Sequence, residues 1–259
     1  LSSVYTKAEI KSDHNEDLRI GLAKLFDNVV LPATMYKPTA EDLGLRKIKF
    51  DDFQSFPDAS TPISYVGWYP LDGEDGGSYT AASGGAPAKV SFTIPEVAST
   101  DILYSDVATG TRLSGFNTMT FRHALVKYSI LVYAMETDDA EVSVADEWGT
   151  VNSVTLESMP SSCVLTLPSD AESLPQVSFE DGPGGSGNLT IDDKELTIPE
   201  NFSNAAMYGY FLAPAPNDNI LSLVVGTEKG GTTRQTLSLA TDFQIGKHYQ
   251  IYLRFTTHG

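Results

Sequence analysis

The sequence has few of the residue types that build cysteine-based and histidine-based sites. It contains one cysteine, Cys163, which excludes a disulfide within the chain and any cysteine-cluster zinc site. The surrounding stretch SSCVLTLP is typical of a buried strand, in which a lone cysteine packs as a small hydrophobic residue. Neither H-x-H nor H-E-x-x-H spacing links the four histidines, which are His14, His123, His248 and His258. We therefore expect no metal site and no cofactor.

Positive charge is also scarce. Lys and Arg number 17 against 34 Asp and Glu, so the formal net charge is −17. The basic residues never cluster into a patch that could neutralise phosphates, which argues against nucleic acid as a partner. An acidic surface suits a protein in an extracellular or cell-surface setting.

Long hydrophobic runs are missing as well. No apolar stretch approaches the ~18 residues of a membrane-spanning helix, and no signal peptide is visible. The chain begins at Leu1 without a methionine, and we interpret it as a processed or trimmed chain. The lack of a targeting sequence is therefore no evidence for a cytoplasmic location.

The dominant pattern is alternation of apolar and polar residues, which is typical of strands with one buried face. It recurs, or gives way to aromatic-rich strand-like runs, at residues 17–26, 46–50, 62–71, 88–95, 151–158, 163–168, 187–200, 205–216, 219–239 and 248–255. Residues 187–200 predict two short strands around an Asp-Asp-Lys hairpin turn, and EKGG at residues 228–231 predicts the tip of another hairpin. About a dozen strands and no helix longer than two turns predict an all-β fold of the sandwich type.

The length of 259 residues suits two ordinary domains better than one large domain. Residues 108–118, ATGTRLSGFNT, are rich in Gly, Ser, Thr and Asn and have few bulky apolar residues. We place the boundary there and predict two tandem β-sandwich domains, residues 1–115 and 116–259, with few or no long helices.

One stretch invites a catalytic interpretation. The acidic segment DILYSDVATG (101–110) precedes the apolar run FRHALVKYSILVY (121–133), which carries His123 near its start. A catalytic histidine needs a nucleophile and an orienting acid beside it, and the sequence has no G-x-S-x-G or other nucleophile motif. We interpret His123 as a hydrogen-bonded, packed residue at the start of a core strand.

Two acidic loops and three aromatic residues are further candidates for ligand binding. The acidic residues are Asp72, Glu74 and Asp75 in one loop and Asp192, Asp193 and Glu195 in the other. Neither loop matches a calcium-binding pattern, so we interpret both as solvated turns. Trp68, Tyr69 and Tyr79 could stack on a sugar ring, although aromatic residues in a sandwich core explain them equally simply.

Five segments carry a resemblance to a known family. They are ISYVGWYPL (63–71), VSFTIPE (90–96), TDILYSDVATG (100–110), MTFRHALVKYSILV (119–132) and FQIGKHYQIYLRF (243–255). The most specific pattern is formed by Asp101, Leu103, Tyr104, Ser105, Phe121, His123, Leu125 and Lys127. Together these segments resemble the fimbrillin family of Bacteroidales surface proteins, which form fimbriae and related adhesins.

The resemblance implies two transthyretin-like, Greek-key β-sandwich domains, exported as an outer-membrane lipoprotein and presented at the cell surface or in a fimbrium. In polymerising members a protease removes an N-terminal strand and opens an apolar groove, which a strand of the next subunit fills by β-augmentation. Arg19 and Arg46 are candidate processing points. Two departures are that no lipidation cysteine stands near the start, and that the chain ends at LRFTTHG, where the family commonly continues into a final strand.

We therefore predict a non-enzymatic fimbrial subunit or adhesin. Its partners would be other subunits or further copies of itself through strand donation, and host surface proteins or glycans. Residues 101–110 would close the first domain and residues 121–133 would begin the second, with His123 fixing the packing at the seam. A carbohydrate-binding surface lipoprotein that uses exposed aromatic residues is the first alternative. A hydrolase is the second, because linear sequence cannot locate a pair of carboxylates across a cleft.

Overall fold

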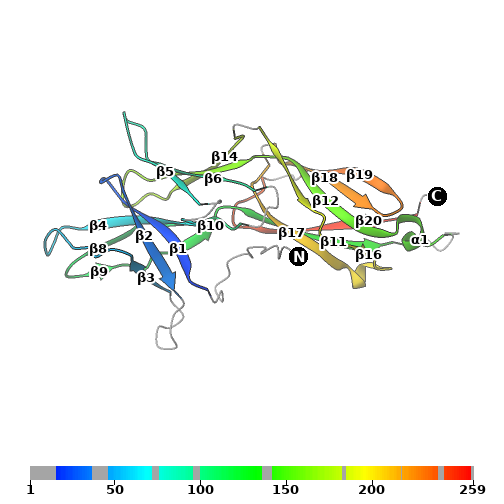
Figure 1. Cartoon of the computed structure of the whole chain (residues 1–259), viewed down its shortest axis with the longest axis horizontal. Helices are drawn as coiled ribbons and strands as arrows, with labels where there is room; N and C mark the ends of the chain where they lie inside the picture. The colour runs from blue at the N-terminus through cyan, green and yellow to red at the C-terminus, as the bar shows by residue number, and fades with distance from the viewer. Residues whose placement is uncertain are drawn as a thin grey trace. The chain divides into compact units, whose positions relative to one another are not determined.

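A computed structural model describes residues 16–36, 46–71, 76–95, 100–135, 142–182, 185–216, 218–238 and 242–257 (Figure 1). These residues are almost entirely β-strands, with a five-residue helix α1 (Val144–Trp148) and a short 3₁₀ turn η1 (Phe202–Asn204). The prediction of an all-β protein without long helices is confirmed. The chain divides into two compact units. Unit 1 comprises Leu1–Ile94, Thr100–Ala124 and Ser162–Glu180, and unit 2 comprises Pro95–Ser99, Leu125–Ser161 and Asp181–Gly259.

Unit 1 is built on two sheets. The larger has the order β10-β7-β4-β1-β2-β3, with β8 pairing to β4 and to β9. Its strands are β1 (Leu18–Lys24), β2 (Val29–Tyr36), β3 (Lys47–Phe50), β4 (Ile63–Tyr69), β7 (Leu103–Ser105), β8 (Ala108–Thr111), β9 (Gly115–Phe116) and β10 (Phe121–His123). The smaller has the order β14-β13-β6-β5, from β5 (Ser78–Thr80), β6 (Lys89–Thr93), β13 (Ser162–Thr166) and β14 (Gln176–Glu180).

Apolar residues of unit 1 pack on both faces of its larger sheet. Trp68 of β4 is fully buried, and its ring stacks on Tyr79 of β5 with centroids 6.1 Å apart, which joins the two sheets. Gly21 lies opposite Trp68 in the β1–β4 pair, and a Cβ at residue 21 would lie 2.3 Å from the indole ring. Only glycine leaves room for that ring. The alternating Leu18 and Ile20 pack on the other face of the sheet.

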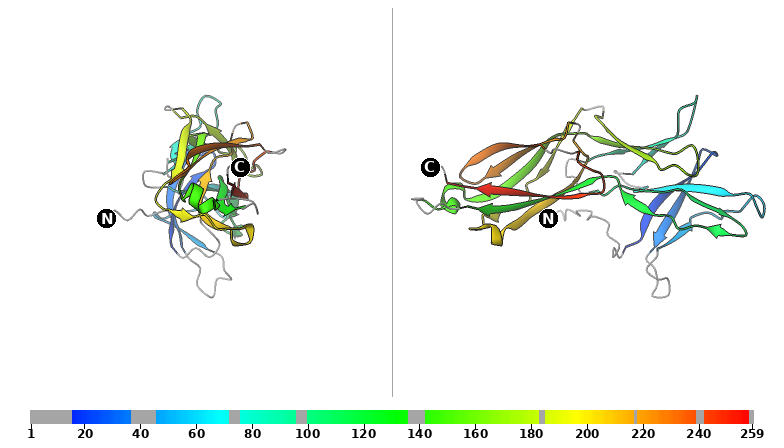
Figure 2. Two further views of the ribbon diagram at one scale, coloured as in Figure 1. Left: turned by 90° about the vertical axis from the view of Figure 1, so that its right-hand side faces the viewer. Right: turned by 180° about the vertical axis from the view of Figure 1, so that it is seen from behind.

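Unit 2 is a second pair of sheets. The three-stranded sheet has the order β17-β11-β20, with β11 (Val126–Ala134) antiparallel to β17 (Ala206–Ala213) and parallel to β20 (His248–Phe255). The five-stranded sheet has the order β15-β12-β18-β19, with β16 also paired to β12. Its strands are β12 (Thr150–Met159), β15 (Gly187–Ile191), β16 (Leu196–Thr197), β18 (Ile220–Thr227) and β19 (Gly231–Ser238). Figure 2 shows β20 (red) in one layer and the β18–β19 hairpin (orange) in the other.

The division into units differs from the expected boundary between residues 115 and 116. Residues 108–118 are not a linker, because they form β8, β9 and their turn, and β8 pairs with β4. β10 pairs with β7 inside unit 1, and the chain passes from unit 1 into unit 2 after Ala124, just before β11. Residues 162–180 return to unit 1, where β13 pairs with β6. A composition rich in turn residues is typical of a hairpin as well as of a linker. The return of residues 162–180 to unit 1 could not be predicted, because pairing between distant segments leaves no local pattern in the sequence.

Two predicted hairpins had different outcomes. β18 and β19 pair from Thr227–Gly231 to Ile220–Ser238, so the hairpin with EKGG at its tip is confirmed. The hairpin around Asp192–Lys194 is wrong in its pairing, because β15 and β16 each pair with β12 and not with one another. The long strand β12 offers enough backbone for both short strands.

Candidate functional site

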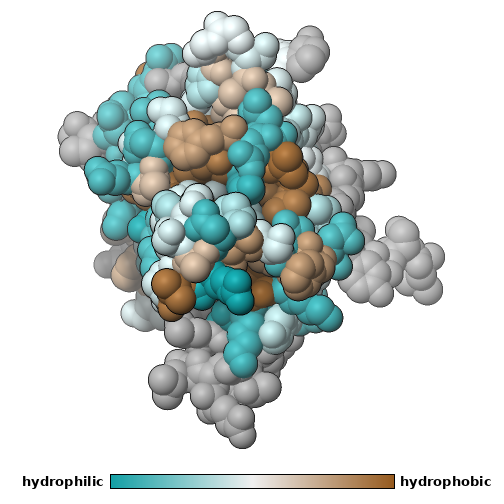
Figure 3. All heavy atoms as spheres, turned by 90° about the vertical axis from the view of Figure 1, so that its left-hand side faces the viewer, coloured by the Kyte–Doolittle hydropathy of each residue, from teal (hydrophilic) through white to brown (hydrophobic). Residues whose placement is uncertain are grey.

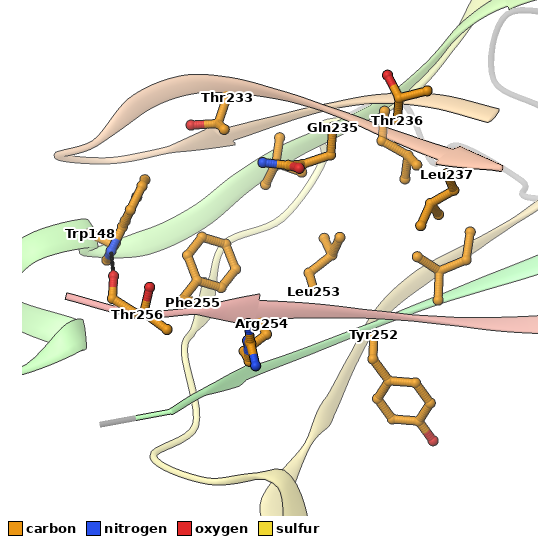
Figure 4. A pocket seen from close by; sticks show the side chains of 13 residues that line it. Trp148, Thr233, Gln235, Thr236, Leu237, Tyr252, Leu253, Arg254, Phe255 and Thr256 are labelled. Atoms are coloured by element: carbon orange, nitrogen blue, oxygen red, sulfur yellow. Dashed lines mark hydrogen bonds between the residues drawn. The ribbon is translucent and has the colours of Figure 1, made fainter. Parts of the chain in front are cut away.

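A groove of about 510 Å³ lies in unit 2 between the β18–β19 hairpin and β20. Figure 4 shows Thr233, Gln235 and Leu237 reaching into it from β19, and Leu253 and Phe255 from β20. Its remaining lining residues are Trp148, Leu223, Val225, Thr236, Ile251, Tyr252, Arg254 and Thr256. The groove therefore has an apolar floor and a mostly polar wall.

The groove exists because the two sheets of unit 2 do not end together. Among the described strands, β20 pairs only with β11, so the three-stranded sheet stops there. β19 continues the other sheet by one more strand and has no strand of the described residues facing it. Leu237 is consequently 37% exposed although it lies beside the fully buried Leu221 of β18, on the core side of the hairpin. Within the described part of the chain, the position opposite β19 thus has room for one more strand.

The outer edge of β20 offers main-chain hydrogen bonds. The Lys247 carbonyl accepts from the Lys127 N–H at 2.9 Å, and the Phe255 carbonyl accepts from the Met135 N–H at 2.8 Å. Since backbone groups alternate in direction along a strand, the odd-numbered residues point toward β11. The N–H and C=O groups of Gln250, Tyr252 and Arg254 therefore point to the open side. This is a sheet edge of the kind that pairs with an added strand.

Helix α1 closes one end of the groove. Ser143 caps the helix by accepting from the Asp146 N–H at 3.1 Å, which places Trp148 in the last turn. The Trp148 indole N–H donates to the Thr256 carbonyl at 2.9 Å, and its ring meets Phe255 edge-on with centroids 5.4 Å apart. A Cβ at Gly230 would lie 2.3 Å from this ring, so glycine at the hairpin tip is what admits it.

The opposite side of unit 2 is closed. Tyr208 of β17 is fully buried, and its hydroxyl donates to the Lys194 carbonyl at 3.1 Å, with the Ile191 carbonyl at 3.3 Å. These contacts join the edge of the three-stranded sheet to the segment between β15 and β16. Burial raises the pKa of the Tyr208 hydroxyl to about 12. The candidate site is thus the one open side of the described sandwich in unit 2.

The residues of the family pattern lie elsewhere. Asp101 is 1% exposed, and its two oxygens lie 2.9 and 3.1 Å from Nδ1 of His123, across the β7–β10 pair. Ser105 Oγ accepts from the Gly67 N–H and donates to the Asp106 carbonyl, both at 2.7 Å. His123 is thus hydrogen-bonded to Asp101 and packed within unit 1.

The remaining members of that pattern divide between the units. Leu103 and Tyr104 are buried in β7 and pair with His123 and Arg122 of β10, and Phe121 pairs with Ser105. Leu125 is buried at the start of unit 2, and the Lys127 ammonium lies 4.7 Å from the centre of the Tyr210 ring.

The sugar-stacking prediction needs a correction. Trp68 is 0% exposed and sandwiched in the core of unit 1, so its ring cannot meet a sugar. Tyr69 points to the opposite face of β4 and is half-buried against the cluster that contains Leu18 and Ile20. Tyr79 lines a small hollow of about 180 Å³ beside Phe26 and Leu167, but one face of its ring is already taken by Trp68. These three residues form no shared aromatic platform.

The two arginines proposed as processing points have structural contacts. The Arg19 guanidinium donates to both oxygens of Asp51 at 2.7 and 2.8 Å, and this hydrogen-bonded pair lowers the pKa of the Asp51 carboxyl. Arg46 donates to the Glu16 carbonyl at 3.0 Å, immediately before β3. Arg19 lies inside β1, so a protease would have to open that strand first. Processing at either residue stays a prediction.

Asp72, Glu74 and Asp75, and the histidines His14 and His258, lie outside the described residues. Within the described ranges, no group of three His, Cys, Asp or Glu side chains could hold a metal ion, which includes the loop of Asp192, Asp193 and Glu195. Nor is any helix there long and apolar enough to cross a membrane. On the face seen in Figure 3, hydrophobic side chains lie in small groups between hydrophilic ones.

Sequence comparison identifies the family of this chain. The model of the fimbrillin-like family matches residues 25–259. The chain belongs to the fimbrillin-like family. A comparison with curated proteins gives no match. The fimbrillin resemblance drawn from the five segments is therefore confirmed.

One solved structure shows a similar fold, and two further structures match with lower scores. A protein of Bacteroides uniformis assigned to cell adhesion is 16% identical, with a TM-score of 0.59 over 94% of this chain and 90% of its own. A second such protein, of Bacteroides fragilis, is 9% identical with a TM-score of 0.48 over 95% and 82%. A fimbrial protein of Bacteroides vulgatus is 10% identical with a TM-score of 0.44 over 93% and 89%. At 16% identity the likeness to the first of these concerns the fold.

Proposed function

We propose that this fimbrillin-like protein is a structural subunit of a fimbrium or related surface adhesin, and that it assembles by accepting an extended strand along the outer edge of β20. Family membership supports the general role of a fimbrial or adhesion-type subunit. The observation that carries the specific role is the groove between β19 and β20, which has an apolar floor and where no strand of the described residues lies opposite β19 or pairs with the outer edge of β20.

An added strand would pair with the open backbone edge of β20 and would cover the apolar floor of the groove. Its backbone would hydrogen-bond to Gln250, Tyr252 and Arg254, while alternate side chains would cover Leu253 and Phe255. This is β-augmentation, in which the main chain supplies affinity and alternate side chains supply specificity. The three-stranded sheet would gain a fourth strand beneath β19, and Leu237 would become buried.

The same proposal gives the protein a location and partners. A fimbrial subunit acts at the cell surface, which fits the strongly acidic composition. We propose that the protein is located there as an outer-membrane lipoprotein before processing. Its partners would be other subunits, and host surface proteins or glycans at the adhesive end. The role is non-enzymatic, and no step of it requires a cofactor.

The proposal can be tested by filling the groove. Gln235 points inward from β19 and is exposed, so a Gln235→Arg side chain would occupy the space of the added strand. Thr232→Arg is the matched control, because Thr232 shares the outer face of β19 with Arg234, which pairs there with Glu157. Light scattering over a range of concentrations should show association of the unaltered chain and of Thr232→Arg, and a monomer for Gln235→Arg. Association of Gln235→Arg as strong as that of the unaltered chain would contradict the proposal.

A further inference from the structure

The outer face of the three-stranded sheet, which points away from the groove, carries exposed apolar side chains. Alternation along β20 turns Leu253 and Phe255 toward the other sheet and Tyr252 to the outside, as Figure 4 shows. Tyr252 is 40% exposed on that face, and Phe202 of η1 is 59% exposed. Single exposed apolar residues are ordinary on a protein surface, but neighbouring ones on one face indicate a contact surface.

Three aromatic rings on this face, those of Tyr133, Phe202 and Tyr252, are in contact, and we call them the aromatic face. The centre of the Phe202 ring lies 5.2 Å from that of Tyr133, on β11, and 5.2 Å from that of Tyr252. The Tyr252 hydroxyl also donates to Oε1 of Gln250 at 3.2 Å. The rings are therefore held in place before a ligand binds, which lowers the entropic cost of binding.

The sheet beneath the aromatic face differs in charge from the rest of the chain. β11, β17 and β20 contain no Asp or Glu, although the chain has 34 of these residues. Arg254 lies beside Tyr133 in the β11–β20 register, and its Nη1 is 3.7 Å from the Met135 sulfur. None of the ion pairs among the described residues joins Arg254 to Glu200, the acid that precedes η1, or to another carboxylate. Its guanidinium is thus available to an anionic group from outside.

We infer that the aromatic face and Arg254 together bind a glycan that bears carboxylate groups. The apolar face of a sugar ring would stack on Phe202 and Tyr252, and a carboxylate would accept two parallel hydrogen bonds from the Arg254 guanidinium. The lack of acidic side chains on the three strands removes the repulsion that such a ligand meets elsewhere on a chain of net charge −17. A second copy docked through the same face is disfavoured, because it would bring one Arg254 against the other.

This inference goes beyond the proposed function, since it concerns a face of unit 2 that strand addition does not use. A strand added at the edge of β20 would lie in the plane of the sheet and leave its outer face open. A subunit held in a fimbrium could therefore bind a glycan at the same time. The two proposals also have separate measurements, because association of copies tests the groove and glycan binding tests the aromatic face.

Biosensor measurements on the immobilised, unaltered chain test the inference with matched probes. One pair is an oligosaccharide of alternating glucuronate and N-acetylglucosamine and a neutral N-acetylglucosamine oligosaccharide of the same length. The other pair is sialyllactose and lactose. We expect at least one acidic probe to bind about tenfold more tightly than its neutral counterpart, and this affinity to fall as salt concentration rises.

Variants on this face should weaken binding of the acidic probe, and matched variants elsewhere should not. We expect a loss of about tenfold for Arg254→Gln and about fivefold for Phe202→Ala. Arg234→Gln is the control for charge, because it removes a guanidinium from the outer face of β19. Phe26→Ala is the control for an exposed ring, because Phe26 is exposed in unit 1. Circular dichroism with thermal melts checks that all four variants are folded.

Three results would overturn the inference: equal binding of acidic and neutral probes, no binding of either acidic probe at about 1 mM, or equal losses in the two arginine variants. If Phe202→Ala weakens association of the chain and leaves glycan binding unchanged, the face contacts another copy, and the inference fails as well. None of these results affects the proposed function, which is tested by the association of Gln235→Arg.

Discussion

The two long sides of the unit 2 sandwich use similar strands but end differently. On the closed side, β17 carries Tyr208, whose buried hydroxyl ties that sheet edge to the carbonyls of Ile191 and Lys194 in the other sheet. On the open side, the described residues show no such tie along the length of β20 and β19, and among them Trp148 bridges the groove at one end. Tyr208, together with the short strands β15 and β16, thus closes one side of the sandwich, whereas the other side has room for an added strand.

The comparison shows where stability and function separate in this fold. The Tyr208 side chain on the closed side is fully buried, so it helps to hold the two sheets of unit 2 together. Side chains that line the open side, such as Gln235 and Leu237, are exposed and contribute little to folding of the single chain. Substitutions on the closed side should therefore mainly lower the free energy of unfolding, and substitutions on the open side should mainly weaken assembly.

The largest expected effect is on the closed side. Tyr208→Ala removes a fully buried aromatic ring and both hydroxyl contacts, so the free energy of unfolding of unit 2 should fall by about 3–5 kcal/mol. Urea unfolding followed by the fluorescence of Trp148, which belongs to unit 2, measures this. A loss under about 1 kcal/mol would show that Tyr208 does not hold the two sheets together.

The next effect is at the end of the open side. Gly230→Ala places a methyl group 2.3 Å from the Trp148 ring, so the indole must move and its hydrogen bond to Thr256 is lost. We expect about 1–3 kcal/mol of destabilisation and a shift in Trp148 emission. Gly187→Ala is the control, because a Cβ at residue 187 meets no atom within 4 Å. Equal behaviour of the two variants would contradict the close approach at the hairpin tip.

A pH titration tests the role of the buried Tyr208 hydroxyl on the closed side. The pKa of Tyr208 rises from its usual 10 to about 12 in the folded chain, so the unfolded state loses this proton first as pH increases. The free energy of unfolding should therefore decline between about pH 10 and 12, and Tyr208→Phe should decline less steeply over that window. At neutral pH the same variant should lose about 1 kcal/mol. Identical slopes for the two proteins would refute the buried tyrosine as their source.

The smallest effect on stability is expected from Gln235→Arg. The substituted residue is exposed on β19, so the free energy of unfolding should change by no more than about 0.5 kcal/mol even though assembly is lost. Parallel urea unfolding and light scattering on one preparation compare the two properties. A large loss of stability would mean that the open side is part of the folded core.

Much of this fold could be predicted from the sequence, and the reason is local. Alternation of apolar and polar residues predicted β1, β3, β6, β12 and β20, because one buried face imposes a period of two, and aromatic-rich composition predicted β4. The groove could not be predicted from local patterns. It arises because β20 pairs with β11, which lies far away in the chain, and because no further strand of the described residues pairs with β20. One signal was available: β18 carries Leu221, Leu223 and Val225 on its inner face, whereas its partner β19 carries Thr233 and Gln235 there. When one strand of a hairpin is apolar on its inner face and the other is polar there, the first is expected to pack against the facing sheet and the second to lie beyond the edge of that sheet.

Trp148 was missed for a different reason. The segment SVADEWG has a capping serine and a terminal glycine, but a helix of five residues is too short for an apolar period to show. Trp68 shows the converse limit, because its aromatic type fits a binding platform or a core equally well. Gly21, which makes room for its ring, stands 47 residues earlier in the chain, and only strand pairing brings the two together.

Hydrogen exchange along β20 tests the central claim most directly. Residue-resolved NMR would compare the monomer at low concentration with the assembled state. In the monomer, the N–H groups of Ile251 and Leu253 should be protected by β11, and those of Gln250, Tyr252 and Arg254 should exchange rapidly. On assembly, the second set should become protected while the first is unchanged. Protection of all five in the monomer, or continued rapid exchange of Gln250, Tyr252 and Arg254 in the assembly, would contradict strand addition at this edge.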